Sequence, residues 1–201
     1  MTRRAEQVDE TRQRIVEAAV EVHGTLGPSA GTISAIAERA GVTRLTVYRH
    51  FPDDAALFAA CSAHWLAGQI PPNPDAWVAI DDPAQRLETG LADLYRFYRD
   101  GAQMLTNIYR DKAFVPASHR DGLDQRDAAF ADLLAAPFTG TATQRRLICA
   151  LVGHATSFWT WRSLCVDQGL SSAQAVSAMS AMILHHASKV GGDSVAEGVT
   201  A

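Results

Sequence analysis

The sequence contains few of the residues that hold metal ions or form disulfide frameworks. Its 201 residues include three cysteines, Cys61, Cys149 and Cys165, with no CxxC pair and no histidine at metal-ligand spacing. Three scattered cysteines argue against a disulfide framework and favour reduced thiols in a cytosol. We therefore expect neither a structural metal ion nor another cofactor.

Long apolar runs are also missing. No window reaches the roughly 18 consecutive apolar residues that a membrane helix needs, and the first residues lack the apolar stretch of a signal peptide. We therefore expect a cytoplasmic protein that does not associate with membranes. The 47% of hydrophobic residues and 20% of charged residues are typical of one or two globular domains.

Positive charge is scarce. The chain has 18 Lys and Arg against 22 Asp and Glu, a net charge of −4, and only residues 1–50 are slightly basic, with seven Arg against six carboxylates. Bulk charge therefore gives no support to nucleic-acid binding. Such a function would depend on where a few arginines point, because affinity for phosphate follows local contacts.

The apolar spacing is helical almost throughout, since apolar residues recur three and four positions apart and alternating strand patterns are nearly absent. The sequence therefore predicts an all-α fold. The expected helices cover about 10–23, 33–40, 44–50, 54–69, 83–100, 103–109, 121–136, 141–166 and 171–189. The expected domains are a helix-turn-helix three-helix domain at 1–52, a larger helical ligand-binding and dimerisation domain at 53–190, and a flexible tail at 191–201.

Two short predicted helices meet at Gly41 with the spacing of a helix-turn-helix. Thr32 is placed to cap the first of them and Thr43 the second, because threonine hydroxyls accept hydrogen bonds from the free N–H groups of a helix start. Gly41 can adopt the positive φ that ends the first helix. Asp53 is placed to cap the helix that follows.

The second of these helices has a polar and basic face. At 100° per residue, Arg44, Leu45, Tyr48 and Arg49 share one side, and Val47 points the opposite way into a core. Arginines on such a face can pair with guanine in the major groove, and hydroxyl and imidazole groups can contact phosphate. The predicted DNA-contacting residues are Thr32, Thr43, Arg44, Leu45, Thr46, Tyr48, Arg49 and His50.

Two further considerations qualify this interpretation. Arg3 and Arg4 could add a mobile arm on the backbone or the minor groove. The alternative to DNA binding is a solvated helix face that ends in a capping threonine, since two arginines and a tyrosine are common on an exposed turn.

The run from Thr32 to Phe58 resembles the N-terminal domain of TetR-family transcriptional regulators. It carries IAERAGV, TVYRHF and ALF in the order and at the spacing of that family, and the likeness covers about residues 10–60. The resemblance implies a homodimer, usually a repressor, that leaves its operator when a small molecule binds the C-terminal domain. Family members often carry Lys where this chain has Asp54, beside Asp53, so we assign no phosphate contact to that turn.

The remaining residues are expected to form a ligand pocket, which the resemblance favours. Aromatic and methionine side chains recur there with a few polar groups among them, the mixture typical of a mostly apolar pocket. Each residue by itself is more often plain core. The predicted ligand-binding residues are Trp65, Tyr95, Tyr98, Met104, Asn107, Phe130, His154 and Phe158.

The predicted helix 141–166 carries two apolar stripes, so one can face its own domain and the other a partner. Together with 171–189 from each of two chains it would form a four-helix interface in a two-fold homodimer. Two recognition helices in such a dimer would lie about 34–36 Å apart and read a palindromic operator in double-stranded DNA.

Catalysis is not expected, because no nucleophile elbow or metal-ligand spacing occurs and the adjacent His185 and His186 point about 100° apart on a helix. We predict no catalytic residues. Two alternatives to a ligand-released repressor stay open: an all-α enzyme that binds a small molecule, and a dimeric DNA-binding protein that responds to no ligand. The sequence does not identify the effector or the operator.

Overall fold

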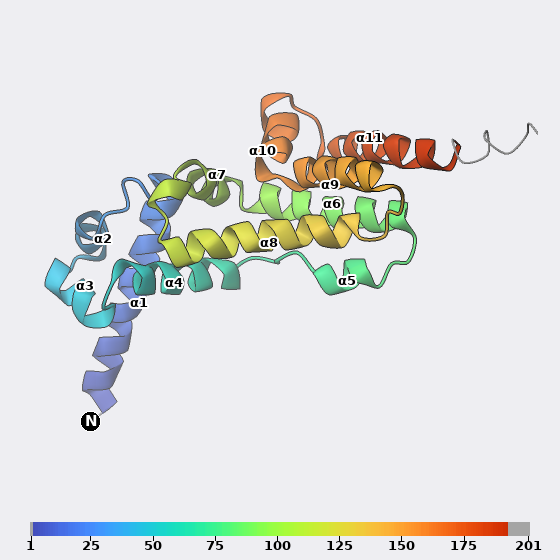
Figure 1. Cartoon of the computed structure of the whole chain (residues 1–201). Helices are drawn as coiled ribbons and strands as arrows, with labels where there is room; N and C mark the ends of the chain where they lie inside the picture. The colour runs from blue at the N-terminus through green and yellow to red at the C-terminus, as the bar shows by residue number, and fades with distance from the viewer. Residues whose placement is uncertain (1, 193–201) are drawn as a thin grey trace, which may run out of the picture. The chain divides into compact units, whose positions relative to one another are not determined.

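The computed structural model describes residues 2–192, with side chains for residues 6–188. The described residues form helices and turns and contain no strand, so the all-α prediction is confirmed (Figure 1). The elements are α1 (Thr2–Thr25), α2 (Ile33–Ala40), α3 (Arg44–His50), α4 (Asp54–Ala67), α5 (Pro74–Val78), α6 (Pro83–Asp100), α7 (Ala102–Arg110), the 3₁₀ turn η1 (Lys112–Phe114), α8 (Ala117–Ala135), α9 (Ala142–Thr156), α10 (Phe158–Trp161), the π-helical turn η2 (Arg162–Asp167) and α11 (Ser172–Gly192). Most of the tail expected at 191–201 lies outside the described residues.

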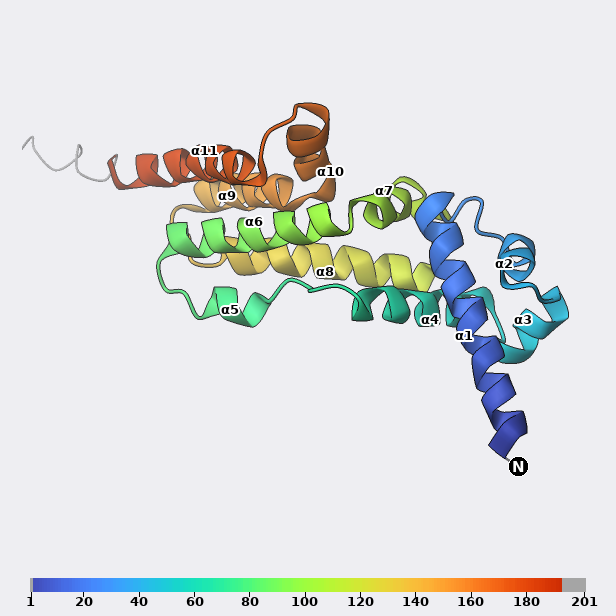
Figure 2. The same ribbon diagram turned by 180° about the vertical axis from the view of Figure 1, so that it is seen from behind.

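The chain forms two compact units, which we call the first unit and the second unit. Within the described residues, the first comprises residues 2–71 and 100–123, and the second comprises residues 72–99 and 124–192. In the first unit α1 packs against α2, α3, α4 and α7. In the second unit α9 and α11 lie side by side in both views (Figures 1 and 2).

Helix caps in the first unit follow the sequence pattern. The Thr32 hydroxyl accepts from Ala35 N at 3.2 Å, and the Asp53 carboxylate accepts from Ala56 N at 2.7 Å. Gly41 ends α2 with φ +66°, a conformation that costs glycine little because it has no Cβ. The boundaries of the helix-turn-helix are thus set by local chemistry.

The core of the first unit forms around α1. Ile15 and Ala19 are completely buried there, with Ile36 of α2, Val47 of α3 and Leu57 of α4 packed around them. Each of these helices therefore contributes an apolar stripe to one shared core. The remaining faces of α2 and α3 are left for solvent or a partner.

Helix α1 is longer than predicted, because it begins at Thr2 rather than near Glu10 and runs past Gly24 to Thr25. The first residues are polar but include no glycine or proline, so nothing in them opposes a helix. The chain leaves the helix at Gly27, where φ is +91° and Pro28 follows. Smaller errors affect α4, which ends two residues earlier than expected, and α8, which begins four residues earlier.

A buried carboxylate fastens the loop after α1 to the end of α7. Asp111 accepts hydrogen bonds from Ser29 N at 3.1 Å and Ser29 Oγ at 2.6 Å, and from Arg110 Nε at 2.7 Å. The guanidinium of Arg110 and the Ser29 donors hold the pKa of Asp111 well below its usual range. These bonds link segments more than 80 residues apart in the sequence.

The second unit has α6 in its core. Leu87, Leu91 and Leu94 are buried along one stripe of that helix. A Cβ at Gly90 would collide with the side chain of Leu134, so α6 and α8 approach closely only because this position has no side chain. The short helix α5, which the sequence did not predict, buries Trp77 in the same unit.

The predicted continuous helix over 141–166 is wrong, because the chain breaks at Ser157. Ser157 is extended, with ψ 136°, and its hydroxyl accepts from Trp159 N at 3.2 Å to start α10. A helix end leaves carbonyls without partners. Two of them are satisfied from α6, since Tyr95 Oη donates to Ala155 O at 2.9 Å and Tyr98 Oη donates to Thr156 O at 2.8 Å.

Candidate nucleic-acid interface

Helix α3 presents the face that the helical-wheel argument predicts. Val47 is fully buried, whereas 78% of the Leu45 surface is exposed and Tyr48 is also exposed. Arg44 and Arg49 are exposed on the same helix. A single buried residue therefore anchors the helix and leaves the rest of it open to a partner.

The start of α3 is ordered by two threonines. The Thr43 hydroxyl accepts from Thr46 N at 3.1 Å and lies 2.9 Å from the Thr46 hydroxyl. A hydroxyl has one proton and two lone pairs, so this arrangement leaves hydrogen-bonding capacity for a phosphate oxygen at a helix N-terminus. Thr32 is exposed at the start of α2, where its hydroxyl caps that helix.

The two arginines of α3, Arg44 and Arg49, one at each end of the helix, have no ion-pair partner among the described side chains. Partial burial and the charges of Arg49 and Arg12 lower the pKa of His50. A phosphate bound beside these groups would reverse that effect and favour the imidazolium.

The extra turns of α1 add a surface that sequence reasoning missed. Gln7, Val8 and Thr11 line a groove of about 430 Å³ together with Arg49 and His50. The expected helix start near Glu10 left Gln7 and Val8 outside any element, whereas Thr11 fell within the predicted helix. Only the absence of glycine and proline before Glu10 signalled the extension. The side chains of Arg3 and Arg4, the predicted arm, lie outside the described residues.

The first turn of α4 is acidic, as the sequence indicates. Asp53 uses its carboxylate to cap the helix, and Asp54 occupies the first helical position with an exposed side chain. Carboxylates repel phosphate, so this turn offers no contact to a nucleic-acid backbone.

Three predicted ligand-binding residues lie in the first unit. Trp65 and Met104 line an open groove of about 270 Å³. The Trp65 ring also lies so close to Gly101 that a Cβ there would contact it. The Asn107 side-chain amide donates to His23 O at 3.1 Å and to Gly24 O at 2.8 Å, which ties α7 to the end of α1.

The other five predicted ligand-binding residues lie in the second unit. Tyr95, Tyr98 and Phe158 are buried, and the two tyrosine hydroxyls are already bonded to backbone. The Phe130 ring lies edge-on to Trp77 at 5.2 Å between centroids. His154 is exposed and lines a hollow of about 270 Å³ with Trp159, Met179 and four other residues. The eight predicted residues thus divide between the two units, and the ligand assignment stays a prediction.

The described residues contain neither a membrane-spanning helix nor a cluster of metal-binding side chains. None of the helices in residues 2–192 is long and apolar enough to span a membrane. The described side chains include no group of three or more His, Cys, Asp or Glu residues arranged to hold a metal ion.

Known proteins resemble this chain in two ways. Residues 15–61 match the family of bacterial regulatory proteins called the tetR family. Over 47 residues, 23% of this chain, the sequence is 53% identical to the HTH-type transcriptional regulator SrpR of Pseudomonas putida and 51% identical to the uncharacterized HTH-type transcriptional regulator TtgW of the same species. The matched segment spans 22% and 35% of those two relatives.

The fold extends the likeness along the chain. The crystal structure of NalD, the secondary repressor of the MexAB-OprM multidrug efflux pump in Pseudomonas aeruginosa, superposes with a TM-score of 0.55 at 19% identity. The superposition covers 90% of this chain and 97% of NalD. At this identity the likeness concerns the fold.

An arginine-bearing helix, capped by threonine and exposed within a helix-turn-helix, is the arrangement typical of the DNA-binding domains of transcription regulators. The order and spacing of IAERAGV, TVYRHF and ALF indicate which family of such regulators this segment resembles. Residues 15–61 are similar to the tetR family of bacterial regulatory proteins.

Proposed function

We propose that this chain is a cytoplasmic repressor that binds a palindromic operator as a homodimer. The observation that carries the proposal is α3, which buries only Val47 and exposes Arg44, Tyr48 and Arg49 with no intramolecular partner for either arginine among the described side chains. Arginine pairs with guanine in the major groove and confers base preference. Tyr48, His50 and the Thr43 hydroxyl are suited to phosphate and would fix the register.

Exposed apolar residues on α9 and α10 support a dimer through about 141–166 and 171–189. On α9, Ile148 and Val152 are buried in the second unit, whereas 44% of the Leu147 surface is exposed. Trp159, just past the break, is 45% exposed. Large apolar side chains left open on one face are typical of a surface that pairs with a second copy.

The effector proposal is a small apolar or aromatic molecule held by the second unit. The hollow beside His154, Trp159 and Met179 combines one imidazole with aromatic and thioether groups, the lining typical of such ligands. NalD, a protein of the same fold, is a repressor of an efflux pump. Repression released by ligand requires the ligand to favour a conformer that binds DNA poorly.

The test is selection of duplexes from a random library with the purified full chain, followed by fluorescence anisotropy on the enriched sequence. The expected result is an inverted repeat with half-site centres about one helical turn, roughly 10 base pairs, apart and two chains bound per duplex. Enrichment of no sequence, or binding of one chain per duplex, would refute the proposal.

The two alternatives have distinct readouts. A dimeric DNA-binding protein without an effector would hold its operator across a library of small aromatic compounds. An all-α enzyme would consume one of those compounds, which mass spectrometry of the mixture detects. We propose that neither occurs and that at least one compound releases the operator without being consumed.

A further inference from the structure

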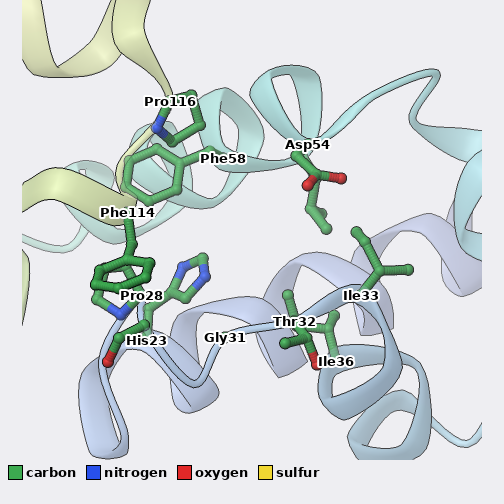
Figure 3. Close-up of a pocket in the computed structure, with 12 residues that line it drawn as sticks. His23, Pro28, Gly31, Thr32, Ile33, Ile36, Asp54, Phe58, Phe114 and Pro116 are labelled. Carbon is green, nitrogen blue, oxygen red and sulfur yellow. The ribbon is translucent and has the colours of Figure 1, made fainter. Parts of the chain in front are cut away.

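A pocket lies within the first unit, and none of its lining residues belongs to α3. Its cavity volume is about 210 Å³, smaller than the roughly 300–1,000 Å³ of pockets for drug-sized ligands. It opens between α2 on one side and α4 on the other, with the loop after α1 and the segment around η1 completing the wall (Figure 3). The space therefore suits a compact ligand.

The walls of this pocket are mostly apolar. Ile33 and Ile36 of α2 face Leu57 of α4, and all three are buried. Phe58 forms another part of the wall, and Phe114 adds a second ring that is 66% exposed to solvent. Two aromatic rings and three branched side chains favour an apolar ligand and can also face a cation.

Asp54 is the only Asp, Glu, Lys or Arg among the residues that line the pocket. Figure 3 shows it on α4, across the pocket from Thr32 and Ile36. No Lys, Arg or His side chain among residues 6–188 forms an ion pair with Asp54. Its negative charge is therefore available to a ligand.

The other titratable lining residue, His23, is held neutral. Burial lowers its pKa, and one ring nitrogen is hydrogen-bonded to the backbone of Gly31. The Nδ1 atom lies 3.5 Å from Sγ of Cys61, a thiol whose pKa burial raises to about 12. Both ring nitrogens thus have partners, and His23 adds no positive charge to offset Asp54.

We infer that this pocket binds a compact organic ammonium ion with an aromatic or branched apolar group, and that Asp54 is its counter-ion. The apolar group fills the space between Ile36 and Phe58, and the ammonium meets the Asp54 carboxylate. The first turn of α2 also borders the pocket. The dipole of a helix places a positive charge of about half an elementary charge at its N-terminus, which is smaller in magnitude than the full negative charge of Asp54. An anion would face that carboxylate and bind poorly.

A ligand here would contact α2 and α4 together. Helix α2 leads through Gly41 directly into α3, so a molecule that fixes the spacing of α2 and α4 alters the placement of the recognition helix. This consequence depends on the proposed DNA-binding function. By linkage, operator DNA and the ammonium ligand then change each other's affinity by the same factor.

The test uses three compounds of similar shape and different charge on the full chain: 2-phenylethylammonium, 2-phenylethanol and phenylacetate. Binding is measured by calorimetry, and amide chemical shifts locate the site. The expected result is that the ammonium binds at least about tenfold more tightly than the alcohol and shifts the amides of Gly31 and Thr32. Tighter binding of phenylacetate, or shifts confined to other segments, would overturn the inference.

Two matched variants identify the counter-ion. Asp54→Asn is expected to remove the preference for the ammonium over the alcohol. Asp53→Asn is the control, because it removes the same charge one residue away, outside the pocket lining, and keeps a side chain that can cap the helix. In this variant the preference for the ammonium over the alcohol should stay within about twofold of that of the unsubstituted chain. Equal losses in both variants would assign the effect to the general field of α4 and contradict a specific role for Asp54.

The two proposals fail separately, because ligand binding is measured without DNA. If the chain binds the ammonium near Gly31 but binds no duplex, the proposed function is refuted and the inference about the pocket still holds. If the chain binds its operator but does not discriminate among the three compounds, the inference about the pocket is overturned and the proposed function still holds.

Discussion

The helix-turn-helix and the second unit differ in what their sequences must preserve. Residues 15–61, which contain the helix-turn-helix, match the tetR family, whereas the fold along 90% of the chain superposes on NalD at 19% identity. A duplex has fixed grooves, so a surface that reads it tolerates few side chains at few positions. A helical core needs apolar volume at suitable spacing, which many sequences supply. We therefore expect exposed residues to be constrained in the helix-turn-helix and buried ones in the second unit.

The largest expected effect comes from the exposed arginines of α3. Arg44→Ala and Arg49→Ala should each weaken operator binding about 10- to 100-fold, since a specific arginine–base contact contributes about 1–3 kcal/mol. Binding to duplexes of unrelated sequence should change less, and the melting temperature should stay the same because both side chains are exposed. Fluorescence anisotropy with operator and scrambled duplexes measures the difference. Unchanged base preference in both variants would remove these residues from readout.

A buried carboxylate in the first unit should affect stability instead. Asp111→Ala leaves the Ser29 and Arg110 donors without their acceptor and should lower the free energy of unfolding by about 3 kcal/mol. Asp9→Ala, at an exposed position of α1, serves as the control with the same loss of charge. Urea unfolding of both variants measures the cost. Similar midpoints would show that the Asp111 contacts contribute little.

One substitution made in both regions sharpens the contrast. Tyr98→Phe removes the hydroxyl bonded to Thr156 O and should destabilise the fold by about 1–2 kcal/mol. Tyr48→Phe, on the exposed face of α3, should leave stability unchanged and weaken binding about equally on all duplexes, as expected for a phosphate contact. Thermal unfolding and anisotropy of each variant provide the four measurements. A loss of stability in Tyr48→Phe would contradict the assignment of Tyr48 to DNA binding and of Tyr98 to the fold.

The smallest expected effect is a pH dependence from His23. Burial lowers its pKa, so below about pH 6.5 the unfolded chain binds a proton that the folded chain does not. Stability should therefore be full above pH 6.5 and fall with decreasing pH, by at most about 1.4 kcal/mol per pH unit. Urea unfolding between pH 7.5 and 5.5 measures the slope, and His23→Gln should flatten it. Asp111, whose pKa is also lowered, adds its own loss only below about pH 4.

Sequence reasoning succeeded where one side chain decides the local structure. Thr32, Thr43 and Asp53 cap their helices as predicted, and Gly41 takes the positive φ that ends α2. Each of these outcomes depends on bonds within three or four residues of the cap. The orientation of α3 followed from periodicity alone because a single residue, Val47, is buried.

Prediction failed where distant segments decide the structure. The break at Ser157 is stabilised by the hydroxyls of Tyr95 and Tyr98, which come from α6 about 60 residues earlier. Those hydroxyls are polar groups among apolar side chains, and the sequence does not reveal whether they meet a ligand or a carbonyl. The pocket beside Asp54 is equally hidden, because Phe114 and the Gly31 loop meet α4 only in the folded chain.

The carboxylates that open α4 also bear on ionic strength. Each phosphate neutralised by a protein cation releases condensed counterions from the duplex, and the number released sets how steeply affinity falls with added salt. Asp53 and Asp54 neutralise none, and the two arginines of α3 are assigned to bases, so we expect α3 and α4 to release few ions per half-site. Occupancy of the operator should therefore depend more on base sequence than on the salt content of the cell.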